Sequence, residues 1–222
     1  MARDVFHLEL EALQAEVLRM GTLVENAIAC SVKALQEQDM ELAEKVIAED
    51  DLVDDLQLQI EDKCLAMLAL QQPMASDLRM IGTALKIVTD LERMADHAVD
   101  IARATQAIGH EPLIKPLIDI PKMAKLTQEM VRVGLTAYID RNVDLCNALV
   151  EKEKEVDRLY DQVFHDLLEF MTRDAKTSRQ ALYLLLVALF LERVADHVTN
   201  LGEWTIYLVT GERKDLNDDH MF

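Results

Sequence analysis

Pairs of acidic residues spaced four apart recur along this chain. Four of the pairs occupy matched places in the two halves of the sequence: Asp50 with Asp54, Glu92 with Asp96, Glu153 with Asp157, and Glu192 with Asp196. On a helix, residues four apart share a face with Cβ atoms about 5–6 Å apart, where like charges repel. Carboxylate oxygens gathered in this way suit hard or borderline cations such as Mg, Mn or Fe better than they suit a thiolate-type zinc site. The spacing therefore indicates candidate cation sites.

The pairs match because the sequence repeats itself. The segment LERMADH at 91–97 returns as LERVADH at 191–197, with one conservative difference in seven residues. A second match, VDDL at 53–56 with VDRL at 156–159, has a slightly larger offset. A length difference in a turn near Gln71-Gln72-Pro73 would account for the change. The sequence therefore predicts an internal duplication.

Few residues interrupt the helical pattern around these pairs. Only 6 Gly and 4 Pro occur in 222 residues, and three of the prolines lie within 112–121. The hydrophobic spacing predicts three long helices in each half, capped by Asp39, Asn142 and Asp174 among others. The predicted helices span 4–37, 40–70 and 75–107 in the first half, and 119–139, 143–172 and 177–209 in the second.

Short connections force neighbouring helices to run antiparallel. We therefore predict an all-α fold of two tandem three-helix bundles with spectrin-like packing. The first repeat spans 1–110, a Pro-rich linker spans 111–121, and the second repeat spans 122–222. We expect the methionines at helical spacing (Met67, Met80, Met94 and Met123) to fill the core, and Trp204 to be a packing residue.

The candidate acids lie at the edge of the apolar faces of these helices, where they can meet carboxylates of a neighbouring helix. The histidines that follow the motif, His97 and His197, are rotated about 100° further round, and we predict that they lie on the surface. A ferritin-like di-iron site needs Glu-x-x-His, which no histidine of this chain provides. In the alternative interpretation the acids are an ordinary solvated face, with Arg93 and Arg193 forming salt bridges.

Composition limits the partners. The 41 acidic and 23 basic residues give a net charge of -18, which repels nucleic acid and anionic membranes. The longest apolar run, 181–191, is shorter than the roughly 18 residues of a membrane span and is expected to be a buried helix.

Cysteine usage and motifs point to a cytoplasmic protein that is not an enzyme. The three cysteines form no CxxC pair, which suggests reduced thiols, and the first residues lack the pattern of a secretory signal. No phosphate-binding glycine loop or nucleophile elbow is present.

The segments QQPMASDLR at 71–79, LKI at 85–87 and DLERMADH at 90–97 closely resemble the PhoU family of phosphate-uptake regulators. The duplicated acidic pairs look like that family's E(D)xxxD motif, and the resemblance covers essentially the whole chain. The second copy departs from it at Ser178-Arg179-Gln180, and Asn200 stands where the first copy has Asp100.

The resemblance implies a cytoplasmic negative regulator of phosphate uptake and of the phosphate-starvation response. Such proteins associate as homodimers and act as adaptors between the ATPase of the phosphate-specific ABC transporter and a sensor histidine kinase of two-component signalling. Some members bind metal. Carried over to this chain, the first metal site would be Asp50, Asp54, Glu92 and Asp96, and the second would be Glu153, Asp157, Glu192 and Asp196.

Two other hypotheses stay open beside a metal-binding adaptor. One is a metal-free helical scaffold whose acidic faces dock basic partner proteins. The other is a metal-dependent hydrolase, which is the weakest because no general base or nucleophile stands apart from the proposed ligands.

Overall fold

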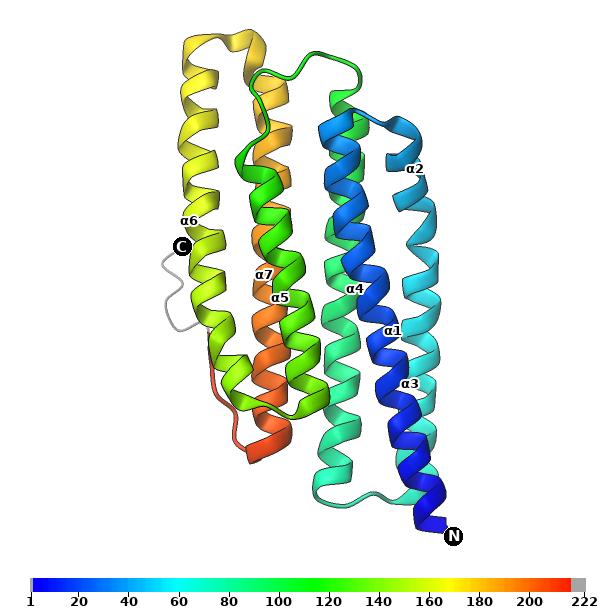
Figure 1. The fold of residues 1–222 in the computed structure, drawn as a ribbon. Coiled ribbons are helices and arrows are strands. Elements are labelled where there is room, and N and C mark those ends of the chain that lie inside the picture. The colour runs from blue at the N-terminus through cyan, green and yellow to red at the C-terminus, as the bar shows by residue number, and fades with distance from the viewer. Residues whose placement is uncertain (1, 217–222) are drawn as a thin grey trace.

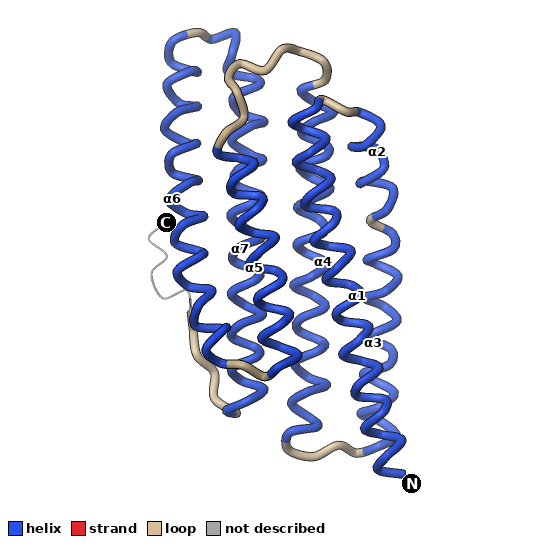
Figure 2. The backbone as a smooth tube through the Cα atoms, in the orientation of Figure 1, coloured by secondary structure: helices blue, strands red, loops and turns tan. Residues whose placement is uncertain are grey.

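The computed structural model describes residues 2–216, so the outermost parts of the two predicted repeats, residues 1 and 217–222, lie outside the described residues. Within that range the helices are joined by loops and no strand is present, as Figure 2 shows, and the all-α prediction is confirmed. The helices are α1 (Ala2–Glu37), α2 (Met40–Glu49), α3 (Asp51–Gln71), α4 (Ser76–Ile108), α5 (Asp119–Asp140), α6 (Val143–Arg173) and α7 (Ser178–Thr210), with a short 3₁₀ turn, η1 (Ala175–Thr177), before α7.

The helices form two three-helix bundles that stand side by side (Figure 1). The first bundle contains α1, the α2–α3 pair and α4, and the second contains α5, α6 and α7. The two bundles meet where α4 packs along α7 and α1 packs along α5. One hydrophobic core runs through both bundles and contains the four methionines predicted to fill it: Met67, Met80, Met94 and Met123.

The second predicted helix, 40–70, is interrupted. The α2 helix ends at Glu49 and α3 begins at Asp51, with a bend at Asp50 (Figure 2). The two segments pack in different places: Val46 of α2 lies in a small cluster with Ala34 and Ala102, whereas α3 packs into the main core. The bend therefore follows from tertiary packing. It could not be predicted from the sequence, because no Gly or Pro occurs there. The corresponding helix of the second bundle, α6, is continuous.

Two of the three predicted helix caps are confirmed. The Asp39 side chain accepts a hydrogen bond from the Leu42 amide at 2.9 Å, and Asn142 accepts from the amides at the start of α6. The side chain of Asp174 instead accepts from the Lys176 amide at 3.0 Å and caps the 3₁₀ turn. The prediction that Asp174 caps the last long helix is wrong because that turn intervenes before Ser178.

The antiparallel pair α4 and α7 is joined by two reciprocal contacts. Arg79, at the start of α4, donates to the carbonyl of Leu208 near the end of α7 at 3.3 Å. Arg179, in the matching position of α7, donates to the carbonyl of Ala107 near the end of α4 at 2.7 Å. Each long helix thus satisfies a terminal carbonyl of the other.

Within the stretch Ser178-Arg179-Gln180, where the second copy is expected to depart, the arginine is kept, and Gln180, which replaces the first copy's Met80, has a structural role. The Gln180 side chain accepts from the Ile114 amide at 2.6 Å and donates to the Pro112 carbonyl at 3.1 Å. These bonds hold the segment between α4 and α5 against the start of α7. The first copy has no such segment to hold, so the same position there needs no amide.

The apolar run 181–191 lies in α7, which packs against α4, α5 and α6. Most of the run is at least partly buried, although Leu182 is 50% exposed. No helix of residues 2–216 is long and apolar enough to cross a membrane. The three cysteines are unpaired thiols, and two of them, Cys64 and Cys146, are buried.

Candidate metal centre

The eight paired acids form two clusters, one in each bundle. The first acidic cluster joins Asp50 and Asp54, at and after the bend between α2 and α3, to Glu92 and Asp96 of α4. The second acidic cluster joins Glu153 and Asp157 of α6 to Glu192 and Asp196 of α7. In each cluster, acids from two adjacent helices lie close enough to affect one another's ionisation.

Ionisation of the first acidic cluster is unfavourable. The pKa of Asp50 is raised to about 6, chiefly by burial and then by the negative charges of Asp54, Asp96 and Glu92, while Arg103 opposes them. The pKa of Asp54 and that of Glu92 are also raised, in both cases first by burial and then by the charge of Asp96. A cation held between α3 and α4 would relieve this repulsion.

Arg93 partly neutralises the first acidic cluster. Its Nε lies 3.4 Å from Glu92 and its Nη1 lies 3.2 Å from Asp96, so the salt bridge expected in the alternative interpretation is present. The Arg93 side chain is 57% exposed, and such surface pairs contribute about 0–1 kcal/mol. A metal ion could therefore replace Arg93 at small cost.

The second acidic cluster contains a deeply buried carboxyl. Glu153 is 4% exposed, and burial raises its pKa to about 8, with Asp157 and Asp196 adding to the effect. Its Oε1 atom is buried and makes no hydrogen bond with any described residue. A buried oxygen that lacks a partner is costly, and a bound cation would supply one.

The donor chemistry of both clusters fits a hard cation, but the side chains as placed do not yet surround one. Among residues 2–216, no three side chains of His, Cys, Asp and Glu converge on a point that could hold a metal ion. Binding an ion therefore requires acids of a cluster to change rotamer. Only then would they provide the several oxygen ligands that such cations take.

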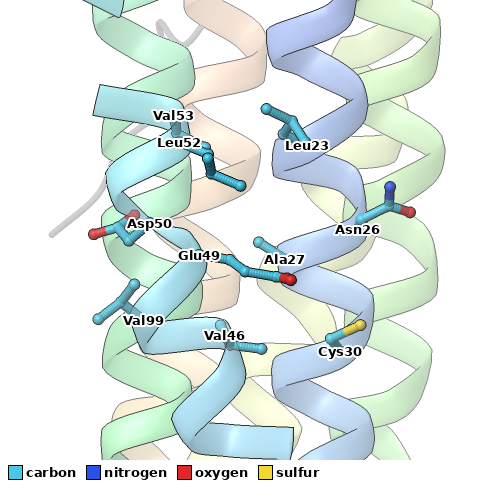
Figure 3. A pocket seen from close by; sticks show the side chains of 10 residues that line it. All are labelled: Leu23, Asn26, Ala27, Cys30, Val46, Glu49, Asp50, Leu52, Val53 and Val99. Carbon is cyan, nitrogen blue, oxygen red and sulfur yellow. The ribbon is translucent and has the colours of Figure 1, made fainter. Parts of the chain in front are cut away.

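A pocket of about 150 Å³ lies beside the first acidic cluster, between α1 and the bend at Asp50. Figure 3 shows Glu49 extending toward α1 while the carboxylate of Asp50 points away from it. Asp50 is therefore shared: it lines the pocket and belongs to the first acidic cluster, and its carboxylate is turned away from α1. Its walls include Cys30 and Asn26 of α1.

The two motif histidines lie between the bundles, so the prediction that they are surface residues is wrong. Their rings are 5.8 Å apart, and His97 stacks on Phe190 at 5.7 Å. His197 places Nδ1 2.9 Å from Asp90, which also accepts a hydrogen bond from Asn200 at 3.1 Å. The rotation of about 100° does turn each ring away from the acids. The helix face that carries each histidine, however, packs against the other bundle.

Sequence reasoning missed the partners of these histidines. Asp90 and Phe190 occupy matching positions of α4 and α7, so one histidine meets a carboxylate and the other an aromatic ring. Asn200 stands out in the sequence only as a departure from the repeat. A comparison of residues that differ between matching positions could have revealed this group. Burial, followed by the charge of His197, lowers the pKa of His97 to about 4.

Comparison with known proteins confirms the duplication of this chain and its family. The family model of the PhoU domain matches residues 17–105 and again 120–205. A phosphate-specific transport system accessory protein PhoU homolog of Clostridium acetobutylicum is 42% identical over 219 residues, covering 98% of this chain and 100% of the relative. The homolog of Aquifex aeolicus is 41% identical over 204 residues, covering 92% of each chain.

Solved structures agree in fold. The crystal structure of PhoU from Pseudomonas aeruginosa has a TM-score of 0.89 at 34% identity, and the match covers 93% of this chain and 100% of that one. The phosphate transport system regulatory protein PhoU of Streptococcus pneumoniae has a TM-score of 0.88 at 30% identity, with coverage of 95% and 99%.

Proposed function

This chain belongs to the PhoU family, and from this premise we propose that it is an accessory protein that restrains phosphate uptake and the phosphate-starvation response. The observation that carries the proposal is similarity over nearly the full length to relatives named as accessory proteins of phosphate-specific transport systems. The matched pair of acidic clusters supports it, because both copies of the family's acidic motif are intact here.

The proposed mode of action is that of a cytoplasmic adaptor without catalysis. It would contact the ATPase subunit of the phosphate transporter and a sensor histidine kinase, and hold both in the inactive signalling state when phosphate is plentiful. A continuous core through both bundles supports this role, because it makes the two bundles a rigid unit with long helical faces. We further propose that the protein forms a homodimer, which its molar mass in solution would test.

We propose that each acidic cluster binds a cation such as Mn, Mg or Fe. In the first cluster Asp50, Asp54, Glu92 and Asp96 would hold the ion, and in the second Glu153, Asp157, Glu192 and Asp196. When bound, the ion supplies positive charge and joins two helices of one bundle. The raised pKa values of Asp50, Glu92 and Glu153 support a need for that charge.

A metal-free scaffold is the second candidate function. The observation that favours it is the placement of the acids, which do not converge on an ion position among the described residues. In this case the acidic faces dock basic side chains of a partner, as Arg93 already pairs with Glu92 and Asp96. Metal analysis of the protein as isolated separates the two candidates.

Deletion of the gene tests the proposed regulation. We expect phosphate-starvation genes to be expressed in high phosphate when the protein is absent, and to be repressed again when it is supplied from a plasmid. Normal repression in the deletion strain would contradict the proposed function.

The double variant E92A/D96A tests the proposed cation. We expect it to lose part of the Mn- or Fe-dependent rise in melting temperature and to leave the metal-free protein no less stable, because it removes like-charge repulsion. The control D51A/D55A removes an exposed acidic pair with the same spacing on α3 and should keep the full metal effect. Equal metal stabilisation in both variants would argue against a cation at the first cluster.

A further inference from the structure

The end of α7 carries an aromatic ring contacted by two cations. Lys86 of α4 places its Nζ 5.5 Å from the centre of the Trp204 ring, and the guanidinium carbon of Arg213 lies 4.6 Å from it. Tyr207 meets the same ring edge-on at 6.2 Å. Cations gathered on one half-buried ring are notable in a chain whose acidic residues outnumber its basic ones by 41 to 23.

Residues 211–216, which we call the C-terminal strap, hold the second cation in place. The Leu216 amide donates to Glu203 at 2.9 Å, and Lys214 donates to the side-chain oxygen of Asn147 at 2.7 Å. Leu216 is buried against the second bundle. The strap and α7 together enclose a pocket of about 330 Å³ lined by Glu203, Trp204, Arg213, Lys214 and Asp215. Because the strap is fixed, its cations lose little freedom when a partner binds.

The surface continues onto α4. Leu78, Gly82 and Lys86 follow one another at four-residue spacing, so they share one face of the helix, and all three are exposed. Gly82 has open space where a side chain would begin. The Thr83 hydroxyl donates to the Trp204 carbonyl at 3.4 Å, which places this stretch of α4 beside the ring. Together these residues form a shallow surface that is both apolar and cationic, and Gly82 leaves space at its centre.

We propose that this surface, the Trp204 patch (Leu78, Gly82, Lys86, Trp204, Arg213 and Lys214), docks an acidic segment of a partner protein. Carboxylates of the segment would meet Lys86, Arg213 and Lys214, and an apolar side chain would lie over Gly82 against Leu78. Tryptophan and arginine are the residue types enriched where binding energy concentrates in protein interfaces. The proposal rests on the proposed adaptor role only in requiring a protein partner, and it uses residues outside both acidic clusters.

Charge decides between an acidic peptide and other anionic ligands. The net charge of -18 opposes the approach of any polyanion, and most strongly that of a nucleic acid, whose phosphate backbone is densely charged over a long distance; a short acidic peptide carries fewer charges and can place them on the cations of the patch. A compact, multiply charged anion such as free phosphate would be repelled by Glu203 and Asp215, which line the same pocket as the cations. An extended peptide can place each carboxylate on a cation and keep clear of these acids.

Fluorescence tests the proposal directly, because Trp204 is the only tryptophan of the chain. The probe is a synthetic peptide of about 16 residues that combines Glu and Leu, compared with the same peptide carrying Gln in place of Glu. We expect the Glu peptide to change Trp204 emission saturably, and the change to weaken with added salt. The variant K86E/R213E should bind it at least about tenfold more weakly.

A matched variant controls for net charge. K33E/R173E makes the same change in charge at two exposed side chains, which are 61% and 72% exposed, and should bind the Glu peptide nearly as the wild type does. Circular dichroism of both variants verifies that they are folded, and the neutral variant K86Q/R213Q should fall between K86E/R213E and the wild type.

Several outcomes would overturn the proposal. These are no emission change with the Glu peptide, an equal response to the Gln peptide, or equal loss in the two charge-reversal variants. An equal, saturable response to inorganic phosphate alone would assign the patch to small anions instead. The measurement uses neither transporter nor kinase, so its failure is distinct from normal repression in the deletion strain, which would refute the proposed function.

Discussion

Replacing Glu153 by Gln should make the metal-free protein more stable, and increasingly so as the pH rises. Burial holds the pKa of this carboxyl near 8 in the folded protein, against an ordinary value of 4.5. The neutral form is thus favoured by folding. The contribution of Glu153 is fully favourable below about pH 4.5 and is lost as the pH rises toward about 8, because ionisation is easier in the unfolded chain. A glutamine side chain does not titrate and escapes this loss.

The size of the effect follows from the pKa difference. Each pKa unit corresponds to about 1.4 kcal/mol, so the loss amounts to about 3 kcal/mol between pH 4.5 and pH 7. The new amide also requires a hydrogen-bond acceptor, and carboxylates of the same cluster lie nearby. Any cost of placing that amide is present throughout the pH range, whereas the penalty for ionising Glu153 grows with pH, so the growth of the difference reports the buried charge.

Urea unfolding at several pH values between 5 and 8, with a chelator present, measures this difference. The control is E151Q on the same helix, since the side chain of Glu151 is 82% exposed. We expect the unfolding free energy of E153Q to rise relative to that of the wild type as the pH increases. The unfolding free energy of E151Q should show the same pH dependence as that of the wild type. If the difference in unfolding free energy between E153Q and the wild type stays constant over this pH range, Glu153 does not have a raised pKa in the folded protein and the reasoning is refuted.

Three further substitutions test the helices and their packing. G21A should destabilise the protein by about 1–2 kcal/mol in urea unfolding. Its Cβ would collide with the buried side chain of Leu135 where α1 meets α5, at a cost of about 1–3 kcal/mol, and the better helix propensity of alanine offsets up to about 1 kcal/mol of that. G82A, whose Cβ meets open space, should instead stabilise α4 by about 0.5–1 kcal/mol. D90A removes the acceptor of His197 between α4 and α7 and should cost about 1–3 kcal/mol in thermal unfolding. An unchanged melting temperature for D90A would show that this buried polar group contributes nothing to joining the bundles.

Most of the fold could be predicted because it rests on local signals. Helix ends follow from capping side chains such as Asp39 and Asn142, which act within one turn of the chain. The bend at Asp50 could not be predicted, because it arises where α2 and α3 pack into different clusters of the core. The prediction that Asp174 caps the last long helix was wrong for a related reason: a 3₁₀ turn lies between Asp174 and the start of α7, and Asp174 caps that turn.

By itself, the sequence determined which acids are paired and that the pairs are duplicated, because a spacing of four on a helix places two side chains on one face. Only the tertiary structure decided how each acid and histidine is surrounded. Glu153 is buried while Asp54 is exposed, although both belong to the same motif. His97 and His197 are covered because α4 and α7 each bury a second face against the other bundle. Helical periodicity specifies the face that packs within a bundle, whereas the fit between two bundles depends on surfaces that assemble only after folding.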